Sequence, residues 1–72
     1  MIVMPQAHFE IFIEKGEDPE KQRYRFRLRA PNGEIIAASE AYESKPNCKD
    51  GIEAVRMYAK YAMLQDLTLK TA

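Results

Sequence analysis

The segment from Arg23 to Ala30 constrains the fold most, because two kinds of side chain alternate strictly along it. Arginine occupies every second position, at Arg23, Arg25, Arg27 and Arg29. The positions between them are apolar or aromatic: Tyr24, Phe26, Leu28 and Ala30. In a helix this pattern would scatter both kinds of side chain around the axis, whereas a strand separates them onto two faces. The sequence therefore predicts a strand with one arginine face and one apolar face.

Two more strands are predicted beside this one. Residues 8–14 also alternate, with Phe9, Ile11 and Ile13 on one side and Glu10, Phe12 and Glu14 on the other. After the arginine-bearing segment comes Pro31-Asn32-Gly33-Glu34, and Asn-Gly favours a type I′ hairpin turn, in which both central residues have positive φ. A third strand is expected from Glu34 to Ser39. The three strands form an antiparallel meander whose covered face holds Phe9, Ile11, Ile13, Tyr24, Phe26 and Leu28.

A helix is predicted after the sheet. Ser44 is the expected N-cap, and Pro46 falls in the first turn, where its missing N–H does no harm. Apolar residues then recur at helical spacing, which predicts one buried stripe. The stripe consists of Cys48, Ile52, Val55, Ala59 and Ala62. Gly51 lies within the helix and is expected to permit a close approach to the sheet, at a cost of about 1 kcal/mol in helix propensity.

The pattern leaves two readings of the last segment, from Ala62 to Leu69. The helix could continue to Gln65, or the segment could form a strand with Met63, Gln65, Leu67 and Leu69 on one side. Thr68 is β-branched and favours the strand.

The length of 72 residues predicts a single domain over residues 1–72, with 8–69 folded and 1–7 loosely ordered. A chain this short has a marginal core. Its single cysteine, Cys48, excludes an internal disulfide, and with only one histidine, His8, a four-ligand structural zinc site is excluded too. Either a very regular core or a partner chain must then supply the missing stability.

The charges balance, with 11 basic and 11 acidic residues. Zero net charge argues against nucleic acid or an anionic membrane as partner. No apolar run approaches the roughly 20 residues of a membrane span, and the N-terminus lacks the features of a signal peptide. With a lone thiol, the interpretation we favour is a cytoplasmic protein.

Several blocks of residues together resemble the YegP-like family, small bacterial proteins of unknown function. These blocks are Tyr24–Leu28, Ala30–Ala37, Ser39-Glu40, Tyr42, Ser44-Lys45 and Gly51–Val55. The resemblance runs from about Phe9 to Thr68 and implies a β-β-β-α-β unit that exchanges its last strand with a second copy in a homodimer. It assigns 62–69 to that strand. Pro46 and Lys60-Tyr61 depart from the family pattern near the two helix ends. The family supplies no catalytic residues and no cofactor.

The arginine row is the sharpest candidate site. Four guanidinium groups on one face could bind an anionic ligand or protein partner. The alternative, which we favour, is a solvated face whose arginines pair with Glu10 and Glu14 across the strands. The candidate binding residues are Arg23, Arg25, Arg27, Arg29, Tyr42 and Lys45.

The other candidates have simpler interpretations. Cys48 belongs to the apolar stripe and is expected to be buried and inert. Tyr42, Tyr58 and Tyr61 could line a pocket, but tyrosines more often fill a core or an interface. Because no nucleophile, base or metal constellation is visible, the predicted function is a non-enzymatic homodimeric interaction module. The alternative is a small-molecule-binding protein or enzyme with a pocket at the dimer junction.

Overall fold

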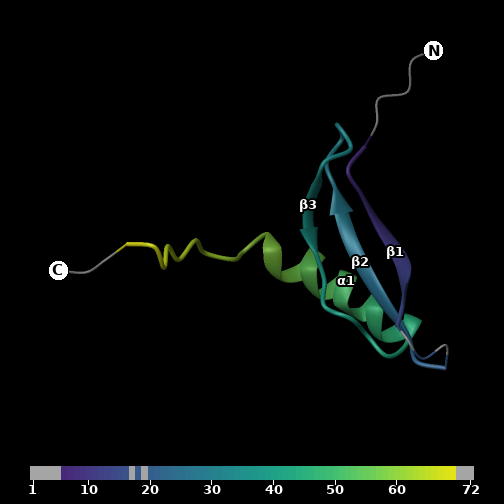
Figure 1. The fold of residues 1–72 in the computed structure, drawn as a ribbon. Helices are drawn as coiled ribbons and strands as arrows, with labels where there is room; N and C mark the ends of the chain where they lie inside the picture. Colours follow the sequence, from purple (N-terminus) through teal and green to yellow (C-terminus); the bar gives the residue numbers. More distant parts are fainter. Residues whose placement is uncertain (1–5, 17, 19, 70–72) are drawn as a thin grey trace, which may run out of the picture.

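A computed structural model describes residues 6–16, 18 and 20–69 of the chain. Three strands come first, β1 (His8–Lys15), β2 (Gln22–Arg29) and β3 (Ile35–Ala38), followed by one helix, α1 (Lys45–Ala59). The helix crosses one side of the sheet, as Figure 1 shows. The predicted α+β class is therefore confirmed. Of the residues 1–7 expected to be loosely ordered, 1–5 lie outside the described residues.

The sheet is an antiparallel meander in the order β1-β2-β3. Eight residue pairs join β1 to β2, among them Phe9 with Leu28 and Ile11 with Phe26. Directly opposed residues lie on the same face of an antiparallel pair. The register therefore gathers the apolar residues of both strands on the side where α1 packs.

The turn between β2 and β3 differs from the predicted type. Gly33 has a positive φ of 89°. Among the described residues no non-glycine residue has a positive φ, so Asn32 does not adopt the type I′ conformation. The Gly33 N–H donates to the Ala30 carbonyl over 2.9 Å, which makes Pro31 and Asn32 the central residues of the turn. Proline fixes its own φ near −65° and so excludes a type I′ turn at this position. Gly33 then supplies the positive φ that returns the chain to β3.

The helix begins as predicted. The Ser44 side chain accepts a hydrogen bond from the Asn47 backbone N–H over 3.1 Å, and Pro46 lies in the first turn. The helix ends at Ala59, with Lys60 as its C-cap. The last two members of the predicted apolar stripe were wrong, because Ala59 is exposed and Ala62 lies beyond the helix.

The core is small. Phe26, Cys48 and Ile52 are its buried residues, and Phe9, Ile11, Tyr24, Tyr42 and Val55 pack around them half-buried. The Phe26 ring meets the edge of Phe9 with ring centroids 5.9 Å apart and stacks on Tyr42 at 6.1 Å. Ile13 stands opposite Tyr24 on the predicted face, but it is 47% exposed near the end of β1 and so is not covered as predicted.

Gly51 allows the close approach that its place in the helix predicts. A Cβ at this position would collide with the Tyr42 hydroxyl and would lie 2.7 Å from Tyr42 Cζ and 3.2 Å from the Phe26 ring. The helix backbone therefore lies directly on the two rings that form the centre of the core.

The last segment forms no strand in residues 60–69 of this single chain. It leaves the end of α1 and extends away from the sheet (Figure 1). Within it, the Asp66 carboxylate accepts a hydrogen bond from the Thr68 N–H over 2.9 Å, a local contact that competes with strand pairing. A strand needs a neighbour to accept its backbone hydrogen bonds, and none lies beside this segment. In the described part of the chain, no helix is long and apolar enough to cross a membrane.

We expect Gly51→Ala to destabilise the domain. Overpacking a core costs about 1–3 kcal/mol, which exceeds the roughly 1 kcal/mol that alanine contributes to helix propensity. Urea denaturation should show a lower free energy of unfolding for this variant. Lys49→Ala, at an exposed position of the same helix, is the control and should change little. An increase in stability for Gly51→Ala would contradict the close contact with Tyr42.

Candidate functional site

The face of the sheet opposite α1 carries most of the charged side chains of β1 and β2. We call it the arginine face. It consists of His8, Glu10, Phe12 and Glu14 from β1 and Arg23, Arg25, Arg27 and Arg29 from β2. Because Phe26 points into the core, its neighbours along β2 must point to this other face. The side chains of Arg25, Arg27 and Arg29 are 35%, 31% and 27% exposed.

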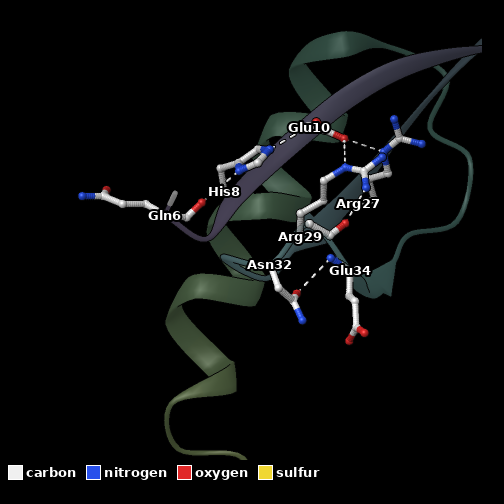
Figure 2. A network of polar contacts seen from close by, with 8 residues as sticks. Gln6, His8, Glu10, Arg27, Arg29, Asn32 and Glu34 are labelled. Carbon is white, nitrogen blue, oxygen red and sulfur yellow. Dashed lines mark hydrogen bonds and ion pairs between the residues drawn. The ribbon is translucent and has the colours of Figure 1, made fainter. Parts of the chain in front are cut away.

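Glu10 is the centre of a polar network on this face (Figure 2). The Nε groups of Arg27 and Arg29 both donate to its Oε1, over 2.6 and 2.7 Å. Its Oε2 lies 3.2 Å from Nε2 of His8. Hydrogen bonds from Arg29, Arg27 and His8 lower the pKa of Glu10 to about 2. A hydrogen bond to the Gln6 carbonyl, together with Glu10, raises the pKa of His8 above its ordinary value.

Arg25 is held at the other end of the face. Its Nη1 donates to Glu14 over 2.9 Å, while Nε and Nη2 both donate to the Ser39 carbonyl, over 3.1 and 2.9 Å. Glu14 stands opposite Arg23 in the register, yet it pairs diagonally with Arg25. Among the described residues, no ion pair involves Arg23.

The structure therefore shows the pairing that we favoured for three of the four arginines. Glu10 takes two of them and Glu14 takes one. Arg29 is further fixed by the Gly33 carbonyl, to which its Nη1 donates over 2.7 Å. Binding of an anionic ligand on this face stays a prediction.

Phe12 is a member of the face whose contact the sequence did not predict. The Arg27 guanidinium carbon lies 4.8 Å from the centre of the Phe12 ring, at the distance of a cation–π contact. The sequence feature that could have predicted this contact is an aromatic residue between two glutamates on the polar side of a strand. The ring helps to hold Arg27 over the sheet.

The single chain does not bring the three candidate tyrosines together. Tyr42 belongs to the edge of the core and forms two backbone hydrogen bonds with Tyr24, over 2.7 and 2.8 Å. Tyr58 and Tyr61 are 68% and 77% exposed near the end of α1. Lys45 is exposed at the first position of the helix. A pocket at a dimer junction stays a prediction, because it needs a second chain.

A groove of about 440 Å³ lies between β1 and α1, and no pattern in the sequence predicted it. Its floor is apolar, with Phe9, Ile11 and Ile52, and its rim is charged, with Lys49, Asp50, Glu53 and Arg56. The Arg56 guanidinium lies 5.5 Å from the centre of the Phe9 ring and 3.5 Å from a Glu53 oxygen. The rim charges are thus partly engaged with one another, and the apolar floor is the distinctive feature of this groove.

Cys48 does not have the surroundings of a nucleophile. Its side chain is fully buried, and this burial raises the pKa of the thiol. The prediction of a buried core cysteine is confirmed, and because the thiolate is the reactive form, this burial disfavours reactivity. In the part of the chain that the structure describes, no three His, Cys, Asp or Glu side chains are grouped to hold a metal ion.

Residues 20–66 match a domain of unknown function, DUF1508. The chain belongs to this family. Its relatives carry the name UPF0339 protein and include YegP of Yersinia pestis, so the resemblance to the YegP-like family is confirmed.

The relatives fall into two lengths. A UPF0339 protein of Treponema denticola is 48% identical over 59 residues, which are 82% of this chain and 93% of that protein. Yersinia pestis YegP is 42% identical over 53 residues, which are 74% of this chain but only 43% of YegP. A solution structure of a protein from Haloferax volcanii is 39% identical, with a TM-score of 0.72, over 88% of this chain and 98% of that chain. The described chain therefore shares its fold with this Haloferax volcanii protein.

We expect stability to depend on the ionisation of Glu10 at acidic pH. Its pKa is about 2 in the folded state, against an ordinary value of 4.5. A lowered folded-state pKa means that the stabilisation is fully present above about pH 4.5 and is lost as the pH falls through about 2. The carboxyl carbon chemical shift of Glu10, followed by NMR, should titrate with a midpoint near pH 2. In Arg29→Gln this midpoint should rise, because one hydrogen bond to the carboxylate is lost. Glu53→Gln should leave this titration unchanged, and a Glu10 titration near its ordinary value would contradict the network.

Proposed function

We propose that this protein is a non-enzymatic interaction module that associates with a second copy of itself through its C-terminal segment. The observation that carries the proposal is the exposure of four large apolar side chains after α1. Met63, Leu64, Leu67 and Leu69 are 92%, 93%, 83% and 73% exposed. Burying side chains of this size contributes about 1.5–3 kcal/mol each, so together they match the whole stability of a small domain.

The sheet offers places where such a segment can pair. In the order β1-β2-β3, both outer strands have an unpaired edge within the described chain. Apolar side chains lie exposed on these two strands: Ile13 on β1 is 47% exposed, and Ile35 and Ile36 on β3 are 53% and 61% exposed. Free edges readily pair with another chain. An arriving strand would satisfy these backbone groups and cover these side chains at the same time.

The length of the relatives also supports two units. The matched region is less than half of Yersinia pestis YegP, which leaves room there for a second unit of the same size. A single-unit chain can reach the same arrangement by pairing with a second copy, and exchange of an element between identical chains is a low-cost route to a dimer. Because the described core has only three buried residues, burial of further apolar surface against a second copy would add to the stability of the chain.

Light scattering coupled to gel filtration tests the proposal. We expect about 16.6 kDa, twice the chain mass of 8.3 kDa. Leu67→Ser combined with Leu69→Ser should shift the protein toward monomer and lower its free energy of unfolding, because the variant lacks the two apolar side chains that the second copy would bury. Hydrogen exchange should show protected amides in residues 62–69 of the wild type, as strand pairing would provide.

The matched control changes two polar residues of the same segment, Gln65→Ser with Thr68→Ser. This variant should keep the mass of the dimer. A wild-type chain that remains at 8.3 kDa up to about 0.1 mM, with rapid exchange in residues 62–69, would overturn the proposal.

A further inference from the structure

The arginine face carries more positive than negative charge. Four arginines of β2 stand on it with two glutamates of β1, which leaves a formal excess of two positive charges before His8 is counted. The whole chain is neutral, so the excess is local and is balanced by acidic residues elsewhere. Sharing one Glu10 oxygen between Arg27 and Arg29 is the clearest sign of this shortage of acid.

Hydrogen-bond donors also remain available on this face. Arg27 donates only through Nε among the described residues, so both of its terminal nitrogens keep their N–H groups free for another acceptor. Arg23 forms no ion pair with the described residues. The arginine side chains follow each other at every second residue of a strand, about 6.8 Å apart. The three side-chain nitrogens of Arg25 already donate to Glu14 and Ser39, so the available donors belong chiefly to Arg23 and Arg27, four residues or about 13.6 Å apart along β2.

We propose that the arginine face binds an acidic protein segment in extended conformation, with carboxylates at alternate positions. Alternate side chains of an extended segment repeat at the same pitch of about 6.8 Å as the arginines of β2. A guanidinium group donates two parallel hydrogen bonds to a carboxylate, a geometry that recurs where arginine clusters recognise acidic motifs. Two such carboxylates neutralise the formal excess.

The size of the excess favours an acidic peptide over nucleic acid. Proteins that bind nucleic acid neutralise many phosphates and are usually basic overall, whereas this chain has no net charge. The one aromatic side chain of the face, Phe12, already lies under the Arg27 guanidinium and is not open for stacking by a base. Glu10 and Glu14 would repel a continuous row of phosphates but leave gaps that separate carboxylates can use.

This proposal does not rest on association with a second copy. Association through the segment 62–69 would use the strand edges, whereas the acidic segment would lie flat on the arginine face, with Ile35 at the border of that face opposite Arg29. The face that α1 covers is the other one. A dimer and a monomer would therefore both present it.

Titration calorimetry with a synthetic peptide tests the proposal. The probe is a peptide of about ten residues in which Glu and Ser alternate, long enough to follow all of β2. The reference peptide replaces each Glu by Gln, and a single-stranded oligothymidylate of equal formal charge is the competing ligand. We expect the Glu peptide to bind, and its affinity to fall as salt rises from about 0.05 to about 0.5 M, because the contacts lie at the surface.

Variants locate the binding site. Arg23→Gln with Arg27→Gln reduces the formal excess to zero and should weaken binding at least about tenfold. The matched control removes two positive charges elsewhere, Lys49→Gln with Lys60→Gln, and should keep the affinity within about twofold. Glu14→Gln raises the excess and should tighten binding, a gain that misfolding cannot mimic.

Four outcomes would overturn the proposal. The first is equal binding of the Glu and Gln peptides, the second is equal loss in the two double variants, and the third is tighter binding of the oligothymidylate than of the Glu peptide. Absence of binding by the wild type at low salt would overturn it as well. Circular dichroism of each variant shows whether the fold is kept. Where the double arginine variant unfolds, the tighter binding expected of Glu14→Gln is the test of the proposal.

Discussion

The pairing of β1 with β2 in a single register is the constraint on which the rest of the structure depends. It places Ile11 beside Phe26 on the side of the helix and Glu10 beside Arg27 on the other side. A slip of one residue would turn each of these side chains to the opposite face. The core and the arginine face therefore have one common origin, and neither can be shifted along the strand without losing the other.

The helix adds little to this sheet except at one line of contact. Cys48 and Ile52 are its buried residues, and Gly51 between them lets the backbone rest on Tyr42 and Phe26. Such a narrow contact covers β2 but leaves Ile13 on β1 and the β1–α1 groove open. A short chain buries only a small share of its surface, and both the small core and the exposed C-terminal segment are in keeping with this.

Features decided by neighbouring residues could be predicted from the sequence, and features decided by distant ones could not. The Ser44 cap and the alternation along β2 depend on a few adjacent residues. The turn type was wrong because Pro31, one residue before Asn-Gly, fixes the backbone at the first central position. The end of the apolar stripe was wrong because Ala59 is exposed and Ala62 lies beyond the end of the helix. The partners of the arginines needed the structure, since Glu14 reaches past the opposed Arg23 to Arg25.

The apolar residues and the arginines of β2 lie on opposite faces of the sheet, so the domain could use two physically different kinds of contact. Association through apolar edges gains free energy by removing surface from water, and charged groups caught in that interface would have to be desolvated at a cost. Here the guanidinium groups of β2 lie on the face opposite α1, so covering apolar side chains on the helix side would leave them hydrated, whereas Ile35 stands opposite Arg29 and would be covered beside it. The alternation along β2 would thus separate the two proposed kinds of contact, a salt-sensitive one on the arginine face and an apolar one with a second copy of the chain.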